Sequence, residues 1–169
     1  MGRKALVLAP IAAAAAVLLL PAAPAPARPT AAQKLFRDKL LADRSVSRDV
    51  KTRLRKGGFV DRRVIFADLT GEGRSDAVVL VHSGGSAGRI ALYVFSAGEG
   101  DDLEIVYRNQ RLYRVRARVP RGGSSLFYRT PVYEPGDELC CPVADRETEL
   151  RWDERRKRFR VAGRRTIQR

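Results

Sequence analysis

The sequence predicts an α+β fold, in which an N-terminal helical segment packs on a twisted antiparallel β-sheet of about six to eight strands. Apolar residues recur at helical spacing up to Gly58, whereas after it they alternate or form short blocks separated by Gly, Asp and Pro. We divide the chain into a signal peptide (1–27), a helical segment (28–58) and an antiparallel β region (59–169). The last two are expected to form one globular unit, which suits their combined length.

The start of the chain has the pattern of a cleavable secretory signal. Arg3 and Lys4 precede an almost wholly apolar run, residues 5–20, and small residues lie at and before Ala27. We expect cleavage after Ala27, with cleavage after Ala32 as an alternative. A retained anchor is a further alternative, because the apolar run is just long enough to stay in a bilayer. The signal predicts a secreted or cell-envelope protein with no membrane span after cleavage.

Two helices are predicted before Gly58. The first begins with a capping box of Thr30 and Gln33 and places Phe36 and Leu40 on one face. The second is capped by a serine, carries one apolar stripe and an acid–base pair, and ends at two glycines. Its signals are Ser47, the stripe Val46, Val50 and Leu54, the pair Asp49 and Arg53, and Gly57-Gly58.

Eight strands are predicted after Gly58. Their ranges are Val64–Ala67, Ala77–His82, Ile90–Phe95, Leu103–Tyr107, Tyr113–Val119, Leu126–Thr130, Glu147–Trp152 and Phe159–Val161. The clearest alternation is that of Tyr113–Val119, where a period of two places Arg114, Arg116 and Arg118 together on a wet face.

The chain is strongly basic, with 33 Lys and Arg against 19 Asp and Glu. Since only two of the basic residues precede position 28, the mature form has a net charge of about +12. Such a charge favours an anionic partner, here a cell-envelope polymer, although a GC-rich coding sequence also produces an arginine-rich composition. The densest basic stretch is the tail Arg151–Arg169, which contains the cluster Arg155, Arg156, Lys157 and Arg158 and the pair Arg164-Arg165. Few aromatic residues accompany it, so nucleic acid is a disfavoured partner.

The segment 68–76 has the oxygen spacing of a calcium loop. Its candidate ligands are Asp68, Thr70, Glu72, the carbonyl of Arg74, and Asp76. The spacing, with Gly73 at the sharp turn, resembles the calcium loop of FG-GAP and VCBS-type repeats, which implies Ca²⁺ as a cofactor. Thr70, Glu72 and the positive charge of Arg74 depart from that pattern. The alternative is a turn in which Asp68 and Asp76 accept backbone N–H groups.

The two cysteines, Cys140 and Cys141, are adjacent. An exported protein is expected to have oxidised thiols. Three states are open: a vicinal disulfide ring, which we favour, a link to another chain, or reduced thiols. A ring is expected to stiffen the loop 135–139.

The elements described above together suggest a family. The Asp-rich loop before a Val-rich strand, the turn at Ser83-Gly84-Gly85, the Cys140-Cys141-Pro142 element and a hairpin at Trp152-Asp153 look like the LppP/LprE-type exported proteins of actinobacteria. The resemblance covers roughly residues 60–160. It implies a cell-envelope location, and it supplies no agreed activity.

The residues favour a non-catalytic protein. His82 is the only histidine and ends an apolar strand, so we expect it to have a structural role. No nucleophile elbow or paired-acid pattern accompanies it, and one His with two adjacent Cys does not match a tetrahedral zinc site. We therefore predict a secreted or cell-envelope binding or structural module with a basic surface, with calcium support as an open hypothesis. The alternative is an exported hydrolase or thiol-redox enzyme.

Overall fold

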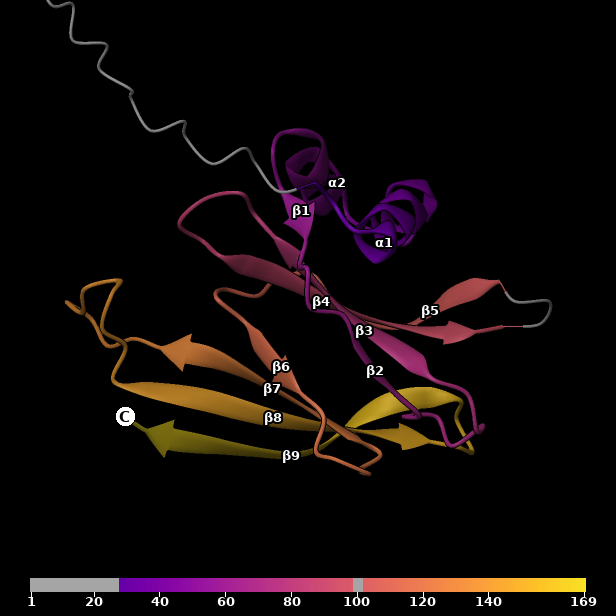
Figure 1. Ribbon diagram of the computed structural model, residues 1–169. Coiled ribbons are helices and arrows are strands. Elements are labelled where there is room, and N and C mark those ends of the chain that lie inside the picture. Colours follow the sequence, from indigo (N-terminus) through magenta and orange to yellow (C-terminus); the bar gives the residue numbers. More distant parts are fainter. Residues whose placement is uncertain (1–27, 99–101) are drawn as a thin grey trace, which may run out of the picture.

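The computed structural model describes residues 28–98 and 102–169, so the predicted signal peptide lies outside the described residues. Two helices are followed by nine strands (Figure 1). The helices are α1 (Ala31–Ala42) and α2 (Arg48–Arg55). The strands are β1 (Phe59–Val60), β2 (Ile65–Ala67), β3 (Asp76–His82), β4 (Arg89–Ala97), β5 (Leu103–Asn109), β6 (Arg116–Arg118), β7 (Ser125–Val132), β8 (Ala144–Asp153) and β9 (Arg158–Gln168).

Within the described residues the strands form two antiparallel sheets, which corrects the prediction of a single sheet. In the five-stranded sheet β4 lies between β3 and β5, and both β1 and β2 pair with the other edge of β3. The four-stranded sheet has the order β6-β7-β8-β9. Figure 1 shows the helices on one side of the five-stranded sheet and the four-stranded sheet on the other. The α+β class agrees with the prediction.

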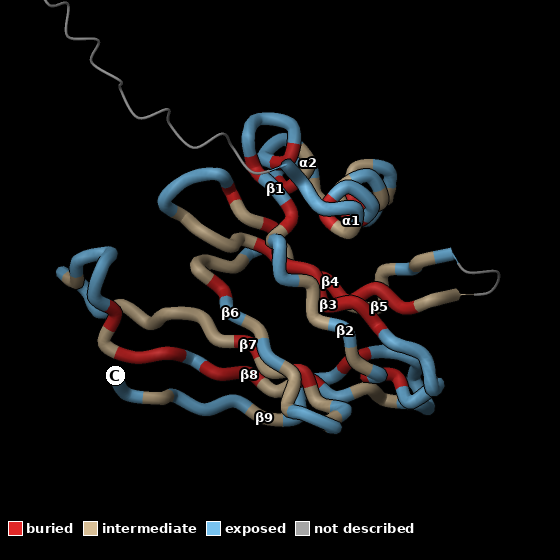
Figure 2. Tube along the Cα trace, in the orientation of Figure 1, coloured by how far each residue is buried: buried red, intermediate tan, exposed pale blue. Residues whose placement is uncertain are grey.

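The two central strands explain why there are two sheets. Alternate residues of β3 and β4 enter two different cores, and both strands are buried along most of their length (Figure 2). Val79 and Tyr93 share one core with residues of both helices, including Phe36. Val78 and Leu92 share the other with residues of the four-stranded sheet. The short apolar runs in the sequence are typical of strands that are covered on both faces.

The predicted caps of both helices are confirmed. Thr30 and Gln33 form both hydrogen bonds of the capping box, and the side chain of Ser47 caps α2. The Gln33 amide also donates to the carbonyl oxygen of Val60 at 2.7 Å. This buried bond ties the first turn of α1 to β1. Phe36 lies in the shared core, where its ring centroid is 5.0 Å from that of Phe95.

The predicted strand Tyr113–Val119 is wrong at its start. Only Arg116–Arg118 pairs with β7, and Arg114 has a left-handed backbone with φ of 46°. The N–H of Val115 instead donates to the carbonyl of Arg89 in β4. The chain crosses from one sheet to the other here, and the crossing interrupts the alternation that the sequence shows.

β1 and β9 also differ from prediction. The strand β1 was not predicted, because two residues are too short for an alternation to be seen. The predicted strand Phe159–Val161 is the first part of β9, which extends to Gln168. This extension is mostly exposed, so hydrogen bonding to β8, and not an apolar pattern, defines it.

Candidate anion-binding site

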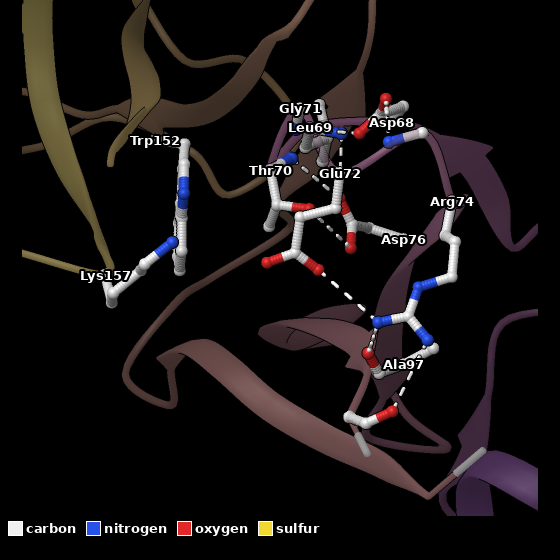
Figure 3. A network of polar contacts seen from close by, with 12 residues as sticks. Asp68, Leu69, Thr70, Gly71, Glu72, Arg74, Asp76, Ala97, Trp152 and Lys157 are labelled. Carbon is white, nitrogen blue, oxygen red and sulfur yellow. Dashed lines mark hydrogen bonds and ion pairs between the residues drawn. The ribbon is translucent and has the colours of Figure 1, made fainter. Parts of the chain in front are cut away.

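The Asp-rich loop, 68–76, folds as a turn closed by its two aspartates (Figure 3). The carboxylate oxygens of Asp68 accept the N–H groups of Gly71 at 2.7 Å and Gly73 at 2.9 Å. Asp76 is buried and accepts the N–H groups of the two residues after Asp68 at 2.7 and 2.9 Å. These are the contacts that the turn alternative predicted.

The other predicted calcium ligands do not complete an oxygen cage. The Thr70 hydroxyl lies 3.4 Å from Asp76, and the Glu72 carboxylate lies 3.5 Å from the Arg74 guanidinium. Arg74 also donates to the carbonyl of Ala97 at 2.7 Å, so a cation already occupies this side of the loop. A calcium ion needs six to eight oxygens free to turn toward it. The loop as folded does not fit calcium, and calcium binding stays a prediction that requires rearrangement.

The cysteines form a vicinal disulfide between Cys140 and Cys141, the ring that we favoured among the three alternatives. The Glu138 carboxylate lies 3.3 Å from the Cys140 sulfur. These three residues form the only group of His, Cys, Asp or Glu in the described chain whose candidate ligand atoms all lie within 4.8 Å of one another. Because disulfide sulfurs are not thiolates, the group lacks the ligands of a zinc site.

The four-stranded sheet carries buried carboxylates on the face that points away from the five-stranded sheet. Glu147, only 2% exposed, accepts from Arg129 at 2.6 Å, Arg165 at 2.8 Å and Arg118 at 3.2 Å. Burial on its own raises the pKa of Glu147, but the hydrogen bonds from the three arginines outweigh burial and lower the pKa to about 2. Glu147 is therefore a fixed negative charge that holds three guanidinium groups.

Asp145 repeats this arrangement two residues earlier on the same face. It is buried and accepts from Arg116 at 2.6 Å and Arg169 at 3.0 Å. Burial opposes ionisation, yet the two guanidinium groups outweigh it and hold the pKa of Asp145 below its usual value. Farther along β8, Glu149 accepts from Arg151 at 2.7 Å.

We call this row of pairs the arginine ladder. Its members are Arg116, Arg118, Arg129, Arg151, Arg165 and Arg169, with Asp145, Glu147 and Glu149. Six arginines against three carboxylates leave a net charge of +3. Arg118 also lies over the ring of Phe127, 4.4 Å from its centroid. The ladder is thus a positive, ordered sheet face.

The residues of the predicted basic surface lie in three separate places. Arg116 and Arg118 lie on the ladder, but Arg114 belongs to the crossing segment. The cluster 155–158 lies apart, at the turn between β8 and β9, where Lys157 pairs with Glu154. The sequence pattern pointed to Arg151, Arg165 and Arg169 only as parts of a basic tail, without placing them on a sheet face, and it did not point to Arg129. Arg129 could have been found, because it alternates with the apolar residues of a predicted strand.

A cavity of about 270 Å³ opens where the β3–β4 turn meets the loop before β8. We call it the arginine pocket, because Arg89, Arg114, Arg116 and Arg169 line it together with His82 and Cys140. Two of these arginines pair with Asp145, and Arg89 pairs with Asp61. The four arginines come from three separate parts of the chain, so only the tertiary structure reveals the pocket.

Arg114 differs from the other pocket arginines in its partners. Its guanidinium donates to the carbonyl oxygens of Ser86, in the β3–β4 turn, and of Leu139, in the loop before β8. Among the described residues no carboxylate pairs with it. The left-handed backbone at Arg114 and the close approach of Gly88, where a Cβ would lie 3.3 Å from Arg114 Cγ, make this crossing possible.

His82 borders the pocket and has structural contacts. Its ring stacks on Phe59 at a centroid distance of 4.6 Å, and its Nδ1 accepts the N–H of Gly84 at 3.0 Å. The neighbouring Cys140 sulfur is held in the disulfide. With these groups occupied, the pocket offers positive charge and N–H donors to a ligand, which suits anion binding.

Comparison of the chain with protein-family models, curated proteins and solved structures found no match. The resemblance to LppP/LprE-type proteins therefore stays a prediction from the sequence. Within the described residues, no helix combines the length and the apolar character needed to cross a membrane.

Proposed function

We propose that this protein is a non-catalytic binding module, secreted or held in the cell envelope, that binds an anionic envelope polymer on the arginine ladder. The observation that carries the proposal is the net charge of +3 on one ordered sheet face. A face with that excess attracts repeated phosphate or carboxylate groups.

The ladder is suited to a polymer because its guanidinium groups are both accessible and held in place. The side chains of Arg118 and Arg165 are 47% and 65% exposed, although both bond the buried Glu147. Each of the four strands supplies at least one ladder arginine, so the positive charge extends across the sheet. Since the carboxylates already order the arginines, less side-chain entropy is lost when a polymer binds.

The proposed location rests on the predicted signal and on the family resemblance. The start of α1 supports cleavage after Ala27 over cleavage after Ala32. Cleavage after Ala32 would remove Thr30, the N-cap of α1, and would split its capping box. Cleavage after Ala27 leaves the whole helix on the mature protein.

The proposal is tested by measuring binding of the purified protein to immobilised linear polyphosphate and polygalacturonate at about 0.15 M salt. In the ladder variant, Arg118→Gln with Arg151→Gln, we expect affinity to fall about tenfold, since each lost contact contributes roughly 0.7 kcal/mol. Glu147 keeps two arginine partners in this variant.

The matched control changes the same amount of charge on the helices, through Lys34→Gln with Arg55→Gln. Both residues are exposed and distant from the ladder in sequence. We expect its affinity to stay within about twofold of the wild type. Equal losses in both variants would show non-specific attraction by net charge, and no binding by the wild type would refute the proposal.

A further inference from the structure

We infer that the arginine pocket is a site for a phosphate monoester, next to the surface that holds the polymer and sharing two arginines with it. The inference goes beyond the proposed function, since it assigns a small ligand to a cavity and not a polymer to a face. Arg116 and Arg169 belong to both sites, whereas Arg89 and Arg114 belong to the pocket alone.

The pocket has an excess of positive charge, which suits an anion. Its four arginines have two carboxylate partners, Asp61 and Asp145, and neither carboxylate lines the cavity. The four arginines and these two carboxylates together have a net charge of +2, and the Glu138 carboxylate, 3.3 Å from the sulfur of Cys140 in the pocket wall, adds one negative charge nearby. A phosphate monoester carries between about −1.5 and −2 at neutral pH.

Arg114 is the residue on which the inference depends most. Because it donates to carbonyl oxygens only, no carboxylate within the described chain neutralises it. A guanidinium presents its N–H groups in a planar fork that suits bidentate contact with phosphate oxygens. The two carbonyl bonds hold it between the β3–β4 turn and the loop before β8, so it need not be ordered when a ligand arrives.

The rim of the pocket is built to keep its shape. The Leu139 carbonyl accepts from the Tyr133 hydroxyl at 3.0 Å as well as from Arg114. The disulfide closes a ring directly after Leu139, and Cys140 lines the cavity. A volume of about 270 Å³ holds a phosphate group with a small attached organic group.

The test is calorimetric titration of the purified protein with glycerol 3-phosphate and with inorganic phosphate, at ionic strength matched with chloride. We expect dissociation constants below about 1 mM for the wild type and at least a tenfold weaker value for Arg114→Gln. Leu139 keeps its bond from Tyr133 in that variant, which preserves the rim. Arg116→Gln is a second variant that should weaken phosphate binding, and Asp145 keeps Arg169 as a partner in it.

The control is Arg151→Gln, which alters the ladder but not the pocket and is expected to bind phosphate within about twofold of the wild type. No heat of binding in the wild type, or equal affinity in Arg114→Gln, would overturn the inference. The two proposals can fail independently. If the pocket does not bind phosphate but Arg114→Gln still binds the polymer, the proposed function holds.

A second measurement distinguishes a lipid headgroup from a free phosphate ester as the ligand. It measures binding to phosphatidylcholine vesicles with and without phosphatidic acid. Binding only to the phosphatidic acid vesicles, lost in Arg114→Gln, supports the pocket with a lipid headgroup as its ligand. Binding to the soluble ester without vesicle binding supports the pocket with a free ester as its ligand.

Discussion

At the scale of single residues, Glu147 decides how the ladder is held together. Three guanidinium groups converge on one carboxylate that is itself buried. Removing a buried charge from such a network leaves its partners without an acceptor, which is more costly than losing an exposed ion pair. The half-exposed positions of the arginines moderate this cost.

We predict that Glu147→Gln lowers the free energy of unfolding at pH 7 by about 1–3 kcal/mol. The folded pKa of about 2 lies below the ordinary value of 4.5, so the ionised carboxylate stabilises the fold above pH 4.5. That stabilisation is lost as the pH falls from about 4.5 to 2. The variant should therefore lose less stability than the wild type across this range.

Urea unfolding at a series of pH values measures this effect. The control is Glu134→Gln, because Glu134 is exposed and its side chain makes no ladder contact. If Glu147→Gln follows the wild-type pH dependence, the carboxylate is not the group whose protonation weakens the fold.

At the scale of elements, the turn 68–76 shows how one sequence pattern serves two structures. The oxygen-bearing residues that would ligate calcium also close a hairpin by accepting N–H groups. Asp76 is buried and Asp68 is exposed, so the two aspartates should contribute unequally to stability.

We predict that Asp76→Ala lowers stability by about 2–4 kcal/mol in calcium-free buffer, because two buried N–H groups lose their acceptor. Asp68→Ala should cost less, about 1 kcal/mol, since water can replace its exposed carboxylate. Thermal melts with millimolar CaCl₂ or with a chelator complete the test. We expect equal melting temperatures, whereas a calcium-dependent rise that is absent in Asp76→Ala would establish the calcium loop.

At the scale of the whole molecule, β3 and β4 join the two cores. Leu92 is fully buried between the sheets, and its neighbour Tyr93 packs toward the helices. A strand that belongs to both cores makes independent unfolding of one layer costly. We therefore expect the helices and the four-stranded sheet to unfold together.

We predict that Leu92→Ala lowers the free energy of unfolding by about 2–5 kcal/mol while a single transition is kept. Trp152, the only tryptophan, reports on the four-stranded sheet by fluorescence, and circular dichroism reports on the helices. The two curves should coincide, and separate midpoints would contradict the coupling of the layers. Leu35→Ala, at a half-exposed position on α1, should change stability by less than about 1 kcal/mol.

Much of the secondary structure could be predicted because its causes are local. Capping residues act on N–H groups three positions away, and an apolar stripe needs only residues at i and i+4. These signals located Thr30, Gln33 and Ser47 correctly. Where the chain crosses between sheets, at Arg114, the same local logic failed, because the backbone there follows its bonds to β4 and not its own alternation.

The sequence by itself determined the helices and their caps, most of the strands, the basic excess and the adjacency of the two cysteines. Only the tertiary structure decided that there are two sheets, that Asp145 and Glu147 collect arginines from three other strands and the chain end, and that a pocket forms beside Cys140. The physical reason is distance along the chain. The pairs that Asp145 and Glu147 make join residues 18 to 29 positions apart, and strand register, which the sequence pattern leaves open, brings them together.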